Sequence, residues 1–311
     1  MSKLNANSIE LGTRTTSQRN ALSATAGEVI FNSDTDTMQL YDGTEWVNIK
    51  KSGQLTATGG TTSTVNGYTV HKFTSSGTFE ITDGIGDIEV LAVGGGGSEG
   101  GAPSGCHGGG GGGGGGVVRR WISGVGAGDK MDVTIGSGGS WRNNGGDTTF
   151  GATATDRYGF IIAKGGGAGG ATLNANGADG GSGGGASRDN PGNNGGTGIQ
   201  KEFGTGGMGN PGGDIGSNTA TAGGGGATGA APPGDPGQPR RGGSGYLATD
   251  FQPGLYVGGG GNAGGITSTP AGQTAGETNG AANTGAGGGG SNGGGTRYSG
   301  GSGVLWVRYT N

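Results

Sequence analysis

Apolar side chains along this chain gather in short runs. Each run holds five or six residues, is rich in Val, Ile, Tyr or Phe, and is bounded by glycine or turn-forming residues, which predicts β-strands. Apolar and polar positions alternate imperfectly within the runs, as in a half-buried antiparallel sandwich. The last run must return to strands far earlier in the chain, so we expect a folded domain. The runs are Tyr68–Phe73, Ile88–Val93, Val117–Ile122, Met131–Ile135, Tyr158–Ala163 and Val304–Tyr309.

The first fifty residues have an ordinary composition and predict a small separate module. Residues 15–22 are polar at first and then predict one helical turn with Thr or Ser as its N-cap. Residues 27–47 predict strand, turn, strand, Asp-Gly turn and strand. A meander of this size buries too little apolar surface to be stable alone. We therefore expect it to dock on a partner or to pack with copies of itself.

Glycine dominates the rest of the chain. It supplies 89 of the 311 residues, and only ten of these precede residue 87. Such a composition by itself favours a disordered low-complexity segment. The alternative is that backbones pack directly on backbones, and the strand runs favour this alternative. Residues 165–300 contain only nine Leu, Ile, Val or Phe, which excludes a side-chain core there.

Extended helices with three residues per turn would allow the backbone N–H and C=O groups of such a glycine-rich region to find hydrogen-bond partners. They have no internal hydrogen bonds, so neighbouring segments can exchange N–H···O=C bonds where glycine allows close approach. Collagen is the competing geometry, but the strict Gly-X-Y repeat is absent. In a packed arrangement Gly112 and Gly260 should tolerate no Cβ. Gly59, expected in a linker, should tolerate one.

Two segments resemble known families. The sequence GEVIFNSDTDTMQLYDGTEWV, residues 27–47, resembles a small β-module that recurs in bacteriophage tail fibres and other virion appendage proteins. The order of strand runs and glycine runs over residues 68–311 resembles the glycine-rich domains of phage tail proteins. It is also similar to the extracellular glycine-rich domain of the anaplastic lymphoma kinase receptor.

The resemblance implies an all-β fold with a short N-terminal β-meander. A jelly-roll-like antiparallel β-sandwich with packed polyglycine II segments would follow. We expect a virion-anchoring module over residues 1–50, a linker over 51–66 and the glycine-rich domain over 67–311. The resemblance also implies a homotrimer, because fibre modules of this kind are usually trimeric.

The expected function is that of a tail fibre or adhesin subunit, located in the virion as a tail appendage and synthesised in the host cytoplasm. Its N-terminus would bind other tail or capsid proteins, and its glycine-rich domain would contact a host cell-surface receptor. The alternative is a purely structural virion component, such as a head decoration or a tail-nozzle fibre, without receptor binding. A polysaccharide-degrading enzyme would need a cleft with paired carboxylates, and acidic residues are few beyond residue 150.

Other functional classes find little support. The net charge of −4 gives no basic surface for nucleic acid, and the chain holds no apolar run long enough for membrane insertion. At this glycine content a G-x-G-x-x-G match is expected by chance and predicts no nucleotide site. Cys106 and His107 lack metal-ligand spacing, and Asp34, Asp36 and Asp42 fit turns better than a calcium loop. We expect no catalytic residue, no cofactor and no metal.

The candidate receptor-binding residues lie in the non-glycine segments between glycine runs. Aromatic and arginine side chains at exposed loops are typical of recognition surfaces. The competing interpretation is that these side chains cap the glycine segments or meet a neighbouring chain. The non-glycine segments are 141–144, 199–203, 232–241, 246–257 and 296–299, and the candidate residues are Tyr246, Phe251, Tyr256, Arg297 and Tyr298.

Overall fold

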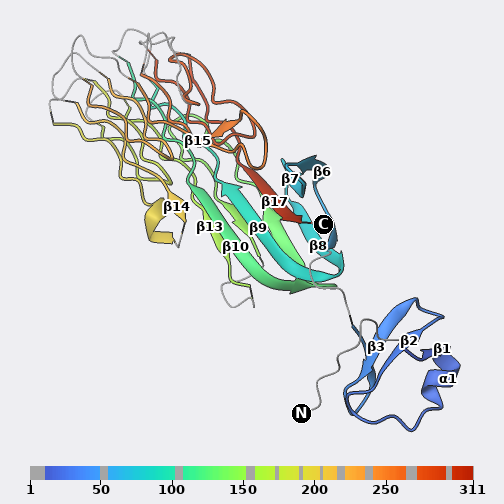
Figure 1. Ribbon diagram of the computed structural model, residues 1–311. Helices are drawn as coiled ribbons and strands as arrows, with labels where there is room; N and C mark the ends of the chain where they lie inside the picture. The colour runs from blue at the N-terminus through green and yellow to red at the C-terminus, as the bar shows by residue number, and fades with distance from the viewer. Residues whose placement is uncertain are drawn as a thin grey trace. The chain divides into compact units, whose positions relative to one another are not determined.

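The computed structural model divides the chain into two compact units, Met1–Gln54 and Leu55–Asn311. Figure 1 shows both units. The structure describes residues 11–49, 55–101, 108–151, 158–171, 175–188, 192–203, 206–215, 221–234, 241–263, 272–291 and 296–310.

The first unit is the β-meander that the sequence predicts. Its sheet has the order β1-β2-β3-β4, with β1 parallel to β2 and the other pairs antiparallel. The predicted helical turn is also present as α1, and the Thr15 side chain caps it by accepting a hydrogen bond from the backbone N–H of Gln18. The elements are β1 (Thr13–Arg14), α1 (Thr16–Asn20), β2 (Val29–Asn32), β3 (Thr37–Tyr41) and β4 (Trp46–Asn48).

The two faces of this small sheet have an unusual polarity. On one face Asn32, Gln39 and Asn48 form a hydrogen-bonded group, and Arg19 of α1 donates to Gln39. The strand register places apolar side chains together on the opposite face, and these are exposed or half-buried. Ile30 is the one apolar side chain of the described first unit that is fully buried. The apolar face consists of Val29, Phe31, Met38, Leu40, Val47 and Ile49.

The second unit contains a β-sandwich, which confirms the all-β fold predicted from the sequence (Figure 1). One sheet has the order β14-β10-β9-β17-β7-β6 and the other the order β13-β12-β11-β8-β5. The first comprises β14 (Gly207–Met208), β10 (Val117–Gly126), β9 (Ile85–Val93), β17 (Val304–Thr310), β7 (Tyr68–Phe73) and β6 (Thr61–Val65). The second comprises β13 (Ile161–Ala163), β12 (Thr148–Phe150), β11 (Lys130–Thr134), β8 (Gly77–Asp83) and β5 (Thr56–Thr58). The short elements η1 (Gln200–Phe203), β15 (Tyr246–Leu247) and β16 (Tyr256–Val257) lie outside the two sheets.

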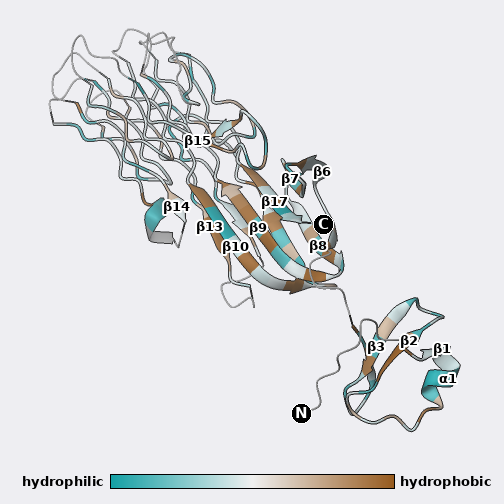
Figure 2. Ribbon diagram, viewed as in Figure 1, coloured by the Kyte–Doolittle hydropathy of each residue, from teal (hydrophilic) through white to brown (hydrophobic). Residues whose placement is uncertain are grey.

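The main core lies between the two sheets, and hydrophobic residues concentrate on the sandwich strands (Figure 2). Phe79 and Phe150 from one sheet pack with Ile88 and Leu305 from the other. The closing strand β17 pairs with β9 on one side and β7 on the other, so the last residues complete the centre of a sheet. The predicted return of residues 304–309 is therefore confirmed, whereas the jelly-roll topology stays a prediction.

The linker predicted over residues 51–66 is wrong from residue 55 onward. Leu55 is buried in the sandwich core, β5 is an edge strand of one sheet and β6 an edge strand of the other. Thr- and Ser-rich edge strands lack the apolar alternation that would have distinguished them from a linker. Gly59, expected to tolerate a Cβ, lies between them at φ 109° and close to the carbonyl group of Thr78. That expectation is wrong as well.

Beyond the ends of β9 and β10 the chain continues as extended glycine segments that run side by side (Figure 1). We call this part the glycine lattice. Its hydrogen bonds repeat every third residue: the N–H groups of Gly94, Gly97 and Gly100 donate to Gly116, Gly113 and Gly110. A repeat of three is the period of a polyproline II-type helix. The repeat supports the polyglycine II conformation, which stays a prediction.

The longest glycine run, residues 108–116, occupies the centre of the lattice. Its N–H groups donate in turn to three segments, 164–170, 222–225 and 285–288. Its carbonyl groups accept from two further segments, 94–100 and 182–185, and from the N–H group of Gly261 on a third. Six backbones therefore surround this run, and a methyl group on any residue from Gly110 to Gly115 would overlap a neighbouring carbonyl oxygen. Its unbroken glycine sequence follows from this geometry.

We expect Gly112→Ala to lower the free energy of unfolding by about 1–3 kcal/mol, because the added methyl group would overlap the carbonyl oxygens of Gly97 and Ser98. Gly77→Ala is the matched control. Its methyl group would come no closer than 4.0 Å to Phe73, so the reduced entropy of the unfolded chain should leave stability unchanged or raised. Chemical denaturation measures both variants. Equal stability would contradict backbone-on-backbone packing around residue 112.

We expect a chain that starts at residue 55 to fold as the second unit does. A chain that starts at residue 67 loses β5, β6 and the buried Leu55 side chain, so it should melt several degrees lower or aggregate. Thermal unfolding and limited proteolysis of both fragments test this boundary. Identical melting of the two fragments would restore a linker over 55–66.

Candidate functional site

The segment that carries three of the five candidate receptor residues is held on the outer face of the larger sheet. Glu89 of β9 is buried, and it accepts hydrogen bonds from Arg119 Nε and Arg308 Nε at 2.7 Å each. Both guanidinium groups also contact Asp250, and Arg119 donates to the Tyr246 hydroxyl at 2.8 Å. Breaking a buried charge network of this kind is costly. The segment 246–257 is thereby fixed to the sheet.

Phe251 and Tyr246 serve this attachment. Phe251 is only 2% exposed and packs against Trp306, with the Arg119 and Arg308 guanidinium groups over its ring. Its burial removes Phe251 from any exposed contact surface. Tyr246 is half-buried, with its hydroxyl group bound to Arg119, whereas Tyr256 on β16 remains 38% exposed. Phe251 therefore packs on the sheet, a structural role closer to the competing interpretation than to receptor contact.

The other two candidate residues lie at the lattice end farthest from the sandwich, in what we call the lattice-end cluster: Trp141, Arg142, Arg297 and Tyr298. The Arg297 guanidinium lies 3.8 Å from the centre of the Trp141 ring, and the Arg142 guanidinium lies 5.4 Å from it. The Trp141 indole also lies beside Gly101, at the end of the segment that leaves β9 at Gly94. Seven residues of extended chain separate this end from the sandwich by about 20 Å.

The backbone at Trp141 and Arg142 is strained. Their φ angles are 25° and 62°, in the left-handed region that bulky side chains rarely adopt. Arg142 Nε donates to the carbonyl group of Gly100 at 2.9 Å, which holds the turn against the lattice. Strained residues that a rigid surrounding fixes in place are typical of functional sites.

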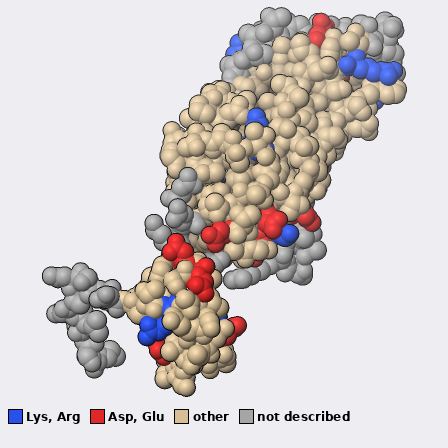
Figure 3. All heavy atoms as spheres, turned by 90° about the vertical axis from the view of Figure 1, so that its right-hand side faces the viewer, with Lys and Arg blue, Asp and Glu red and all other residues tan. Residues whose placement is uncertain are grey.

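The lattice carries few charged side chains, so the places where they gather indicate candidate contact sites. Figure 3 shows a largely uncharged middle of the second unit, with charged side chains gathered toward its ends. Among the described residues neither Arg142 nor Arg297 has a carboxylate partner. Arg297 and Tyr298 are candidates predicted from the sequence. Trp141 and Arg142 lie in the non-glycine segment 141–144 but were not among the candidate residues. Their signal was present in the sequence, as a Trp-Arg pair bounded by glycine-rich sequence.

Glu99 lies beneath the cluster and is fully buried. The backbone N–H of Tyr298 donates to Glu99 Oε1 at 3.1 Å, and the N–H of Glu99 donates to the carbonyl group of Tyr298 at 3.0 Å. Burial raises the pKa of the Glu99 carboxyl from 4.5 to about 7, against the opposing effect of the hydrogen bond from the backbone N–H of Tyr298. The cluster therefore rests on an acid that titrates near neutral pH.

Residues 73–310 match the family model of the glycine-rich domain. The chain belongs to the glycine-rich domain family. The match spans nearly all of the second unit, from the end of β7 to the end of β17. No curated protein matches the chain.

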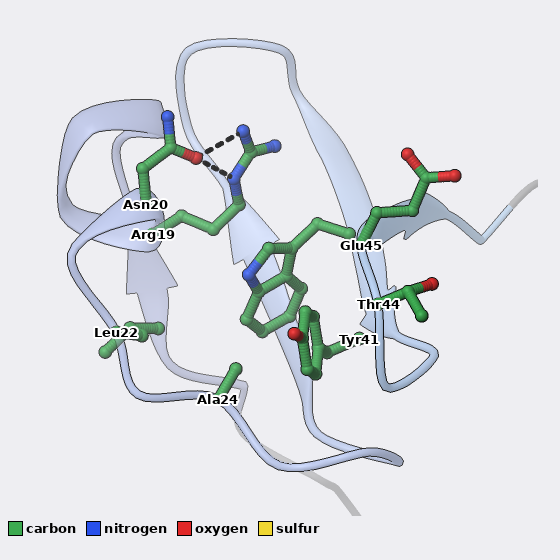
Figure 4. Close-up of a pocket in the computed structure, with 8 residues that line it drawn as sticks. Arg19, Asn20, Leu22, Ala24, Tyr41, Thr44 and Glu45 are labelled. Carbon is green, nitrogen blue, oxygen red and sulfur yellow. Dashed lines mark hydrogen bonds between the residues drawn. The ribbon is translucent and has the colours of Figure 1, made fainter.

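Outside the glycine-rich domain, the first unit carries a hollow of about 400 Å³ beside α1 (Figure 4). Tyr41 and Trp46 form an aromatic pair in it, with ring centres 5.4 Å apart. Arg19 and Asn20 lie on one side, linked by two hydrogen bonds, and Thr44 and Glu45 lie on the other. The hollow is on the polar, helix-covered face of the sheet and not on the apolar face.

Within the part of the chain that the structure describes, no three His, Cys, Asp or Glu side chains are grouped to hold a metal ion. No helix within the same residues has the length and hydropathy of a membrane span. Cys106 and His107 lie outside the described residues.

We expect Glu99→Gln to change the pH dependence of stability. Glu99 has a raised pKa in the folded protein, so its contribution is fully present below pH 4.5 and is lost as pH rises through about 7. The wild type should therefore lose stability between pH 5 and pH 8 relative to Glu99→Gln. Thermal melts across this range measure the difference, with Asp132→Asn, an exposed acid on β11, as control. A constant difference between wild type and Glu99→Gln would contradict the buried titration.

Proposed function

We propose that the protein is a subunit of a bacteriophage tail fibre or adhesin. In this proposal the lattice end of the glycine-rich domain contacts the host surface, and the first unit attaches the subunit to the virion. The observation that carries the proposal is the lattice-end cluster, which presents Trp141, Arg142 and Arg297 on a rigid support. Sequence resemblance to phage appendage modules supplies the biological setting.

The construction of the domain supports contact at this end. The central glycine segments bury their backbones among one another and present no side chains, so recognition must use the turns that join them. Trp, Tyr and Arg supply most of the binding energy in protein interfaces, and a rigid support lowers the entropic cost of binding. Trp141 is 47% exposed, and Arg142 and Arg297 are also exposed.

The first unit supports attachment to other protein. Its apolar face is uncharged and uncovered among the described residues, and on the other face Ile30 is the one apolar side chain that is buried. A unit as small as this one buries a small fraction of its surface on folding and is marginally stable alone. In our proposal tail or capsid proteins, or the other subunits of a homotrimer, cover Val29, Phe31, Met38, Leu40, Val47 and Ile49.

The alternative is a structural virion component without receptor binding, such as a head decoration or a tail-nozzle fibre. The fixed segment 246–257, with Phe251 in the core, is compatible with either function. The exposed and strained Trp141 favours a contact function, because a purely structural lattice has no use for it.

We expect Trp141→Ala to reduce adsorption of virions to the host by about 30-fold, the equivalent of a hot-spot loss of about 2 kcal/mol. Trp121→Ala is the matched control, because Trp121 is 51% exposed on β10 of the sandwich. Tyr256→Ala tests the remaining exposed candidate. Virion yield and melting temperature show that assembly and fold persist. Equal adsorption of the Trp141 and Trp121 variants would favour the structural alternative.

A further inference from the structure

We propose that the lattice-end cluster binds an anionic polysaccharide, with Arg142 and Arg297 on its carboxylate or phosphate groups and Trp141 against a sugar ring. The inference rests on the proposed function for its biological role, but the binding itself is independent of it. The observation that carries it is the convergence of two guanidinium groups on one exposed indole at a single end of the lattice.

The two arginines retain their capacity to bind an anion. Arg142 uses Nε and one terminal nitrogen on the carbonyl groups of Gly100 and Gly101, so its other terminal nitrogen has no acceptor among the residues that the structure describes. Among the residues that the structure describes, Arg297 makes one interaction, its stacking on the Trp141 ring. A stacked guanidinium keeps its N–H groups directed outward in its plane, where a carboxylate or phosphate accepts two parallel hydrogen bonds.

The acidic side chains described near the cluster form no ion pair with Arg142 or Arg297. Glu99 is buried, bonds the backbone of Tyr298 and lies below the exposed surface. Glu277 is an acidic neighbour of Glu99 and has interactions of its own. The whole chain carries a net charge of −4, so nonspecific attraction to a polyanion is excluded as the source of binding. Attraction must come from a local site.

The cluster is also organised before any ligand arrives. The φ angles of Trp141 and Arg142 fix the turn, and hydrogen bonds from Arg142 tie it to the segment 94–101. Arg297 is positioned by its contact with the indole at 3.8 Å. Preorganised donors lose little entropy on binding. The exposed indole supplies a flat apolar surface with a polar edge, which suits a ring that is apolar on one side and hydroxylated at its rim.

Three probes with one polymer backbone test the proposal on the full chain. Dextran is neutral, carboxymethyl-dextran carries carboxylates and dextran phosphate carries phosphates. We expect binding to one or both anionic dextrans, weakened by salt, and none to dextran. Arg142→Gln and Arg297→Gln should each weaken binding about tenfold, as expected for loss of a charge-assisted hydrogen bond. Arg14→Gln, an exposed arginine of the first unit, makes the same charge change and should have no effect.

The proposal of an anionic ligand is wrong if dextran binds as well as its anionic derivatives. It is also wrong if the Arg142, Arg297 and Arg14 variants bind the anionic dextrans with equal affinity. Melting temperatures of the variants show that the lattice is intact. The outcomes also distinguish a failure of the ligand class from a failure of the proposed function. If polyanion binding depends on both arginines but adsorption to host cells does not depend on Trp141, the site stands and its role in adsorption is wrong. If adsorption depends on Trp141 but no polyanion binds, the contact function stands and the ligand class is wrong.

Discussion

The hydrogen bond between backbones of neighbouring extended segments is the interaction on which this protein depends. Nearly every peptide group in the centre of the lattice has a partner on another segment, and the partners change with a period of three. A buried N–H without a partner is costly, so the segments are stable only together. The lattice replaces a hydrophobic core with shared hydrogen bonds, and glycine is the residue that permits the required approach of backbones.

The sandwich fixes where the glycine segments enter the lattice and in which register. Strands β9, β10 and β17 enter or leave the lattice directly, and the register between β9 and β10 continues into the pairing of residues 94–100 with residues 110–116. Side-chain packing between the two sheets therefore sets the alignment of segments that have no side chains of their own. The charge network around Glu89 adds a second layer, because it fixes residues 246–257 over the outer face of the same sheet.

The sequence predicted the fold class and the strands with strong apolar runs, since Ile88–Val93 and Val304–Tyr309 carry an unambiguous pattern. It missed β5 and β6, because edge strands rich in Thr and Ser resemble a linker. The candidate site was predicted in part. Arg297 lies where a contact surface is expected, whereas Phe251 lies in the core, since its partners Arg308 and Trp306 come from the distant closing strand. Local sequence carries no information about such long-range contacts.

The central position of β17 has a consequence for biosynthesis. Strands β9 and β7 flank it, yet residues 94–303 are made between β9 and β17. Until β17 is synthesised, the larger sheet has a gap at its centre, and the high sequence separation makes its closure slow. A chain cut between β9 and β17 keeps both flanking strands but lacks the strand that pairs with them. The larger sheet is therefore completed only after all of residues 94–303 have been made.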